Sequence, residues 1–339
     1  MSEIVNGSSR AAQFDRRSFL RGAGSLPLAA VAAGLGFSAS AEAAEVAPIK
    51  RAGHGSFLKT SVNAYSFTKL LNAKIKHHEQ GMDLYDVVDF CADHNIDGFD
   101  ATGYFFPDFP TRPTNQYIND LKLKAFESGV GISGSGVRNN FTVADADKRA
   151  ADVVIIKQWV EIASQLGAPV LRVFADTQMR SKTWKDVAPG KTRAEVAAYI
   201  TENLRECADH GEKHGVIIGV QNHGDFLQTA EQQLELIGRV NSKWCGAIVD
   251  TGYYKTADPY KDMAEAAPYA VNWQIKQSAF GAASPIPLDL KRLFEIIRKS
   301  GYRGYVPIET LSVAGLPYDP FKIVPAFMDQ VRKAIVETA

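Results

Sequence analysis

The feature that most constrains the fold of this chain is its alternation of short apolar runs with longer amphipathic stretches. The clearest apolar run lies in residues 216–226, VIIGVQNHGDF, where apolar residues give way abruptly to amide, imidazole and carboxylate side chains. Four to six apolar residues bounded by polar ones are typical of a strand buried on both faces in a parallel sheet. Polar groups at the carboxyl end of such a strand are where α/β barrels place their chemistry.

The alternation continues from residue 60 to the C-terminus. We expect strands at residues 61–65, 98–102, 129–135, 170–175, 216–222, 247–250, 271–276 and 305–311. Helical periodicity occupies residues 84–94, 116–128, 148–166, 193–214, 230–240, 260–266, 288–300 and 320–336. Eight strands alternating with eight helices over about 280 residues predict a single (β/α)8 TIM barrel at residues 46–339. A doubly wound sheet is the alternative, but residues 61–70 contain none of the glycines that its phosphate loop requires.

Residues 1–45 differ in composition from the rest of the chain. The pair Arg16-Arg17 precedes Phe-Leu, an apolar segment spans residues 23–37, and Ala41-Glu42-Ala43 is a candidate cleavage site. This order predicts an export signal and linker, and the paired arginines resemble a twin-arginine signal. Because about 15 apolar residues are short for a bilayer span, we expect no stable membrane insertion after cleavage. We therefore expect the protein in the periplasm.

Charge and cysteine content exclude several function classes. The 38 basic residues balance the 38 acidic ones, which gives no indication of a nucleic-acid partner. The three cysteines are widely spaced, without zinc-site spacing or an evident disulfide framework. We expect buried structural thiols, and the oligomeric state is left open, with a homo-oligomer as one outcome.

Four consecutive strands are expected to end in polar side chains that converge on one mouth of the barrel. The oxygen-bearing side chains at these ends are Gln221, Asp250, Gln274 and Glu309, with His223 and Lys276 nearby. Isolated carboxylates and a lysine within apolar strands are costly unless they are paired or bound to a metal. All-oxygen ligation suits magnesium, manganese or calcium better than zinc.

The sequences VQNHGDF, IVDTG, NWQIK and VPIET, in this order and spacing, resemble the xylose-isomerase-like barrels of the sugar phosphate isomerase/epimerase family. The resemblance extends from about residue 61 to the C-terminus and implies a small carbohydrate substrate. It also implies one divalent metal ion, manganese or magnesium, whose ligands here would be Gln221, Asp250, Gln274 and Glu309.

One position departs from that family pattern. Gln221 stands where many relatives have a glutamate, so the metal site would lose one negative charge. An amide cannot act as a proton acceptor, which leaves Glu309 as the one clear carboxylate base and puts a two-base epimerase in question. We expect His223 to contact a substrate hydroxyl or to shuttle a proton. Lys276 would polarise a carbonyl, stabilise an enediolate, or pair with Glu309.

Four further residues are assigned to substrate binding: Arg172, Asp100, Tyr104 and Asn222. Arg172 lies on the fourth strand and would point toward the mouth. Asp100 lies on the second strand, and Tyr104 opens an aromatic segment that either stacks on a sugar ring or packs on the barrel rim.

These residues predict proton abstraction next to a carbonyl of an unphosphorylated sugar or sugar derivative. Isomerisation or epimerisation is the outcome that the resemblance implies. Elimination from a keto-sugar glycoside shares the same first step and needs a single base. A sugar-binding barrel without catalytic activity is the alternative of another class. An endonuclease-like relative would require more histidine ligands and a basic groove, and the sequence shows neither.

Overall fold

The structure, a computed structural model, describes residues 46–339 apart from residues 52, 54, 180 and 314. The predicted export signal at residues 1–45 lies outside the described residues. Within the described part of the chain, no helix is both long enough and apolar enough to cross a bilayer.

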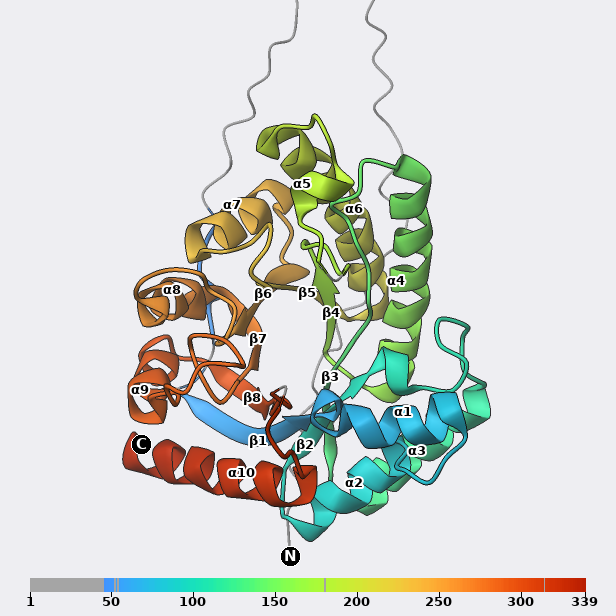
Figure 1. Ribbon diagram of the computed structural model, residues 1–339, viewed down its shortest axis with the longest axis vertical. Helices are drawn as coiled ribbons and strands as arrows, with labels where there is room; N and C mark the ends of the chain where they lie inside the picture. The colour runs from blue at the N-terminus through green and yellow to red at the C-terminus, as the bar shows by residue number, and fades with distance from the viewer. Residues whose placement is uncertain (1–45, 52, 54, 180, 314) are drawn as a thin grey trace, which may run out of the picture. The chain divides into compact units, whose positions relative to one another are not determined.

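Eight parallel strands form the ring of a barrel (Figure 1). They are β1 (Phe57–Asn63), β2 (Gly98–Thr102), β3 (Gly131–Gly136), β4 (Val170–Phe174), β5 (Ile217–Gln221), β6 (Cys245–Asp250), β7 (Ala270–Gln274) and β8 (Arg303–Ile308). Hydrogen bonding runs in the order β7-β6-β5-β4-β3-β2-β1-β8. A parallel bridge between Ile275 and Ile308 joins β7 to β8. The predicted (β/α)8 TIM barrel is therefore confirmed.

The helices surround this ring on its outside (Figure 1). They are α1 (Thr68–His77), α2 (Leu84–Asp93), α3 (Asn115–Glu127), α4 (Ala146–Leu166), α5 (Trp184–Val187), α6 (Arg193–His214), α7 (Ala230–Val240), α8 (Pro259–Ala266), α9 (Leu290–Lys299) and α10 (Pro320–Glu337). Eight of them match the expected ranges, whereas α1 and the four-residue α5 were not expected from the sequence. The expected boundaries of α6 and α7 agree with the structure to the residue.

Local side chains fix where the long helix α6 begins and ends. Thr192 and Glu195 form a reciprocal capping box that bonds the free N–H groups of its first turn. Gly215 ends the helix at φ 71°, a left-handed conformation that glycine adopts without steric penalty. The chain can then turn directly into β5, which carries part of the candidate site.

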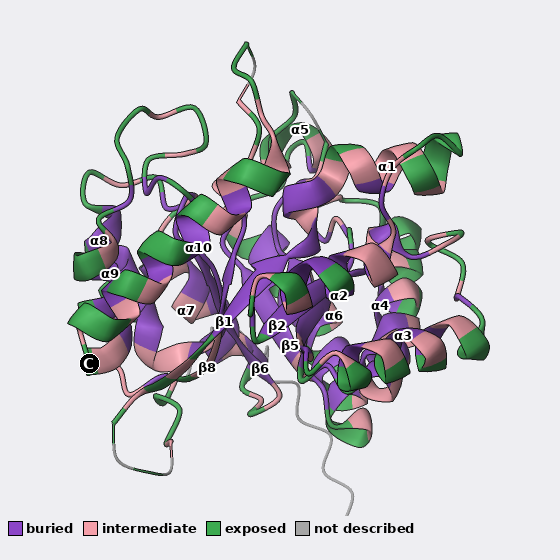
Figure 2. Cartoon of the chain, turned by 90° about the horizontal axis from the view of Figure 1, so that it is seen from below, coloured by how far each residue is buried: buried purple, intermediate pink, exposed green. Residues whose placement is uncertain are grey.

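Burial follows the two-layer pattern of a barrel, with buried strands and helices that are exposed only on their outer face (Figure 2). The interior of the barrel also contains polar side chains below its mouth. The hydroxyls of Ser61 and Ser133 lie 2.7 Å apart, and the Asn63 amide donates to Gln274 over 3.0 Å. These polar pairs form a hydrogen-bonded layer beneath the mouth.

Candidate active site

A cavity of about 640 Å³ opens at the carboxyl ends of the strands, as the barrel fold predicts. Six of the ten predicted site residues line it: Tyr104, Arg172, Gln221, His223, Lys276 and Glu309. The other four are buried and do not line the cavity: Asp100, Asn222, Asp250 and Gln274. The structure therefore brings the predicted catalytic residues together and places part of the predicted set beneath them.

Lys276 lies between two carboxylates at one side of this cavity. Its ammonium forms a short ion pair with Oε1 of Glu309 and lies 3.4 Å from Oδ2 of Asp250. Gln221 donates its amide N–H to the same Asp250 oxygen over 2.5 Å. The side chain of Lys276 is only 5% exposed. We call Gln221, Asp250, Lys276 and Glu309 the charge cluster.

The surroundings of Lys276 keep it positively charged and in place. Burial acts to lower the pKa of its ammonium, but Asp250 and Glu309 outweigh burial and raise that pKa above its ordinary value. The backbone N–H of Lys276 donates to the Thr251 hydroxyl over 2.9 Å. A Cβ atom at Gly252 would lie 2.9 Å from Cγ of Lys276, so glycine leaves room for the lysine stem. The lysine is therefore a fixed cation.

Two of the predicted residues bond to the protein itself. The Asn222 side chain accepts from the Asp250 N–H over 2.8 Å and donates to the Asp250 carbonyl over 2.9 Å, as a paired backbone would. The side-chain oxygen of Gln274 accepts the Asn63 amide. Asn222 thus holds Asp250 at the end of β6. Its assignment to substrate binding, and that of Gln274 to metal ligation, stay predictions.

His223 lies among aromatic rings at the cavity wall. Its imidazole stacks on Tyr253, with ring centroids 4.3 Å apart and planes at 22°, and it meets Phe174 edge to face. Burial, followed by the positive charges of Lys276 and Arg172, lowers the pKa of His223 to about 3. The ring is therefore neutral at physiological pH and has one nitrogen that donates and one that accepts.

The aromatic wall and one carboxylate were missed in the sequence. Phe174 follows Arg172 by two residues on the same strand face, and Tyr253 closely follows Asp250, so strand-end position was the available signal. Asp176 lies two residues after the end of β4 and is fully buried. Its carboxylate accepts from the backbone N–H groups of four residues in the loop after β5: His223, Asp225, Phe226 and Leu227.

We predict that Asp176→Asn destabilises the protein and displaces His223. An amide keeps the size of the side chain but cannot accept hydrogen bonds at both terminal atoms, so buried N–H groups lose their acceptor. The free energy of unfolding should fall by about 2–4 kcal/mol, as measured in urea. The matched control is Asp186→Asn, at an exposed cap of α5, which should change stability by less than about 1 kcal/mol. Equal stability of Asp176→Asn and the wild type would contradict the assigned role.

Asp100 is buried below the cavity, not at its surface. The Thr102 hydroxyl donates to its Oδ1 over 3.2 Å, whereas Oδ2 has no hydrogen-bond partner among the described residues. Burial raises the pKa of Asp100 to about 6, against the lowering effect of Arg172. This position separates Asp100 from the residues that a bound substrate would meet first.

The raised pKa of Asp100 predicts a pH-dependent gain in stability for Asp100→Asn. The neutral carboxyl is favoured in the fold, so the stability that it contributes is complete below pH 3.8 and is lost as pH rises through about 6. At pH 8 the amide should therefore stabilise the protein by roughly 3 kcal/mol, and the gain should vanish near pH 4. Thermal unfolding of both proteins across this range measures the difference, and a gain that is independent of pH would contradict the explanation.

Arg172 and Tyr104 form another part of the cavity wall. The Arg172 guanidinium donates to the Val137 carbonyl over 2.8 Å and to the Tyr104 hydroxyl over 3.0 Å. It also lies over the Phe174 ring, 4.2 Å from the centroid. Tyr104 is the cavity-lining member of the predicted aromatic segment, because Phe105 and Phe106 are buried in the core.

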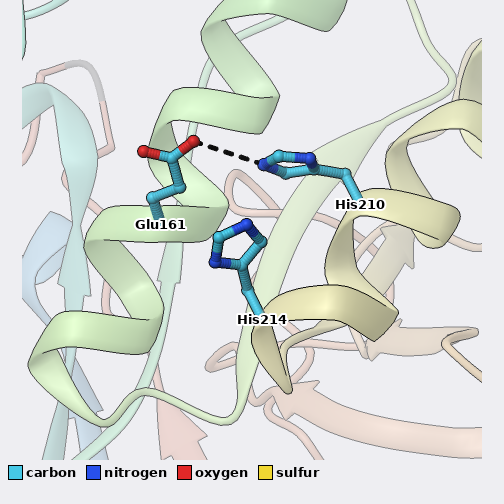
Figure 3. A group of neighbouring side chains, drawn as sticks. All are labelled: Glu161, His210 and His214. Carbon is cyan, nitrogen blue, oxygen red and sulfur yellow. Dashed lines mark ion pairs between the residues drawn. The ribbon is translucent and has the colours of Figure 1, made fainter.

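A second group of metal-type side chains lies outside the barrel (Figure 3). Glu161 on α4 faces His210 and His214 on α6, and one ligand atom from each lies within 4.8 Å of the others. Oε1 of Glu161 is 3.4 Å from Nε2 of His210. These residues occupy the C-terminal parts of their helices, which lead back to the amino ends of the strands. This outer cluster is therefore separate from the predicted ligand set at the mouth.

Comparison with known proteins supports the fold. No curated protein matches the sequence. The structure resembles a D-psicose 3-epimerase from Clostridium cellulolyticum H10 that was solved with D-tagatose, at TM-score 0.67 and 15% identity, covering 82% of this chain and 99% of that chain. It also resembles the 3-keto-D-glucoside 4-epimerase YcjR from E. coli, at TM-score 0.64 and 15% identity, covering 81% and 99%.

A third solved structure is the IOLI protein with a bound zinc atom, at TM-score 0.60 and 14% identity, covering 83% of this chain and 97% of that one. At these identities the likeness shows the fold. The sequence itself matches the family described as Xylose isomerase-like TIM barrel over residues 88–328. The chain therefore belongs to the xylose isomerase-like TIM barrel family.

Proposed function

We propose that this protein is an enzyme of the sugar isomerase/epimerase type that removes a proton next to a carbonyl. Its substrate would be an unphosphorylated sugar or sugar derivative. The observation that carries this function is the buried Glu309–Lys276 ion pair at the cavity, a carboxylate base beside a fixed ammonium. The epimerase neighbours support the reaction class at the level of the fold.

The chemistry follows from the positions of three side chains. Glu309 takes the proton from the carbon beside the carbonyl, and the C–H electron pair moves into an enediolate. The Lys276 ammonium donates a hydrogen bond to the oxygen on which negative charge develops. The neutral His223 imidazole can pass a proton between substrate oxygens. Return of the proton to the neighbouring carbon gives the isomer, and return to the opposite face of the same carbon gives the epimer.

No step is assigned to a divalent ion. The side chains expected to hold it do not fit one as they are arranged, because Lys276 and Gln221 already bond the two carboxylates of the charge cluster. The amide oxygen of Gln274 is likewise bonded to Asn63. A divalent cation at this position would meet a fixed positive charge within a few ångströms.

Elimination from a keto-sugar glycoside is the second candidate function. One observation favours it: Glu309 is the single carboxylate among the residues that line the cavity. Elimination needs one base and a leaving group, whereas a two-base epimerase needs a second proton carrier on the opposite face of the substrate carbon. The predicted export of the chain, which rests on residues 1–45, also favours free sugars or glycosides outside the cytoplasm.

The test is proton exchange in D₂O, followed by NMR with a panel of ketoses, aldoses, sugar acids and 3-keto-glycosides. The proposed function predicts deuterium at the carbon next to the carbonyl of at least one substrate. Isomer formation, or release of the glycosidic group, would then identify the reaction. A folded protein that binds panel sugars without exchange or elimination would instead be a sugar-binding barrel, and the enzymatic function would be wrong.

A further inference from the structure

We propose that the Lys276 ammonium takes the position and the electrostatic role of a divalent metal ion, so that the mouth of this barrel works without one. Its environment is that of a cation site, with one carboxylate in a short ion pair and a second at 3.4 Å. Both carboxylates come from strand ends, Asp250 from β6 and Glu309 just after β8. The role of the ammonium in catalysis rests on the proposed function.

The Gln221 amide, a neutral hydrogen-bond donor, completes the bonding of Asp250 in the charge cluster. An amide at Gln221 donates a hydrogen to Asp250, which a glutamate at that position could not do without a bound proton. The assignment of nitrogen and oxygen in this amide follows from its neighbour, since the alternative would place two oxygens 2.5 Å apart. The carboxylates of Asp250 and Glu309 together carry two negative charges, and Lys276 neutralises one. A doubly charged ion would bring two further positive charges beside the ammonium, so it could bind only by displacing the lysine side chain.

The backbone around Lys276 is also adapted to it. The N–H of Glu309 donates to the Ile275 carbonyl over 2.8 Å, which sets β8 beside Lys276 at the closure of the barrel. Gly252 leaves the space that the lysine stem occupies. The Glu309–Ile275 backbone hydrogen bond and the space at Gly252 therefore place the ammonium against the two carboxylates. The cation of this site is thus a side chain of the protein.

The test is metal binding by the full chain, measured without substrate. The outer cluster of Glu161, His210 and His214 could bind metal by itself, so the measurement uses His214→Ala. After chelation and dialysis, Mn²⁺ is added and followed by electron paramagnetic resonance and by thermal unfolding. We expect no tightly bound equivalent of Mn²⁺ and no rise in the unfolding midpoint. We also expect unchanged proton exchange in the presence of chelator.

Removing the ammonium should create the missing site. In His214→Ala/Lys276→Met the two carboxylates become free, so one equivalent of Mn²⁺ should bind and raise the unfolding midpoint. If this double variant does not fold, Mn²⁺ binding by His214→Ala alone tests the inference. One tightly bound equivalent in His214→Ala that is lost on adding Glu309→Gln would overturn the inference. Because metal binding is measured apart from activity, this inference and the proposed function can fail separately.

A second inference comes from the opposite wall of the cavity. The geometry points to a subsite for an anionic group of the substrate, a carboxylate, at Arg172. This guanidinium is 3% exposed and lines the cavity. Among the described residues, no carboxylate oxygen lies within 4.0 Å of Arg172, Arg138 or Lys69, all three of which line the cavity. The hydrogen bonds of this buried guanidinium go to uncharged groups, and a bound anion would offset part of its desolvation cost.

The side chains around Arg172 orient it for this purpose. Two of its five N–H donors bond Val137 and Tyr104, which leaves others for a ligand. A Cβ atom at Gly136 would lie 2.7 Å from the guanidinium nitrogens, so glycine gives the group its room. The Arg138 guanidinium lies 5.1 Å from the centroid of the same Tyr104 ring and adds a second positive charge.

The test compares D-glucuronate, D-glucose and D-glucose 6-phosphate by thermal unfolding and calorimetry. We expect glucuronate to bind more tightly than glucose. Arg172→Met should weaken glucuronate binding by about ten- to a hundred-fold and weaken glucose binding much less. Arg149→Met, at an arginine that lies outside the cavity lining, is the matched control. Equal binding of glucose and glucuronate would overturn the subsite. Tighter binding of the phosphate ester than of glucuronate would overturn the choice of a carboxylate. If Arg172→Met does not fold, the affinities of the wild-type protein for glucuronate, glucose and glucose 6-phosphate test the subsite.

Discussion

Lys276→Met is expected to cause the largest combined loss of stability and activity of any single substitution at the cavity. Methionine keeps the length of the side chain but leaves Asp250 and Glu309 as buried carboxylates that face each other without a cation. Breaking a buried ion pair in this way lowers the free energy of unfolding by about 3–5 kcal/mol. Loss of the hydrogen bond to the developing oxyanion should reduce the rate constant by a further 10²- to 10³-fold, a typical effect of removing one such donor.

Urea unfolding and proton exchange measure the two effects separately. The matched control is Lys255→Met, an exposed lysine near the same Tyr253 ring, which should change stability by less than about 0.5 kcal/mol. If Lys276→Met and Lys255→Met had equal stability, the carboxylates would not depend on the ammonium. The charge cluster would then need another explanation.

Glu309→Gln is expected to abolish proton exchange while the protein still folds and binds substrate. Glutamine has the same shape but cannot take a proton from carbon, so the turnover rate should fall by about 10²- to 10⁴-fold. Lys276 keeps Asp250 as a partner at 3.4 Å, and stability should therefore fall less than in Lys276→Met.

Loss of a catalytic base lowers the turnover rate and leaves substrate affinity nearly unchanged, whereas loss of a binding residue lowers the affinity. In Glu309→Gln the rise of the unfolding midpoint on adding substrate should stay close to that of the wild type. Glu265→Gln, an exposed carboxylate on α8, controls for the loss of a charge. Full activity of Glu309→Gln would remove Glu309 from the reaction and would favour the sugar-binding barrel.

The sequence was sufficient for the barrel because its strands are short apolar runs that end in polar residues. It was insufficient for α1, whose sequence TKLLNAKIKH contains one buried residue, Leu71, and so lacks an apolar stripe. The four-residue α5 is too short to show any period. The pairing of β1 with β8 joins strands from opposite ends of the barrel sequence, and no local pattern records it.

At the site, too, the sequence pattern predicts which residues come together but not the contacts that they make. Strand-end position was enough to group Gln221, His223, Lys276 and Glu309, because parallel strands converge. It could not show that Lys276 lies between two carboxylates, since this depends on the distances between three strands. Nor could it show that Asp100 is buried beneath the cavity. Asp176 carried the same strand-end signal and could have been found.

Deuterium exchange by chelator-treated wild-type protein shows whether Glu309 and Lys276 remove a proton next to a carbonyl. The substrate is the panel sugar that raises the unfolding midpoint most, and NMR in D₂O follows its C–H signal next to the carbonyl. We expect loss of that signal with the wild type, in the presence of chelator, and no loss with Glu309→Gln. A signal that persists with the folded, sugar-bound wild type, or disappears equally with Glu309→Gln, would contradict this role of the two residues.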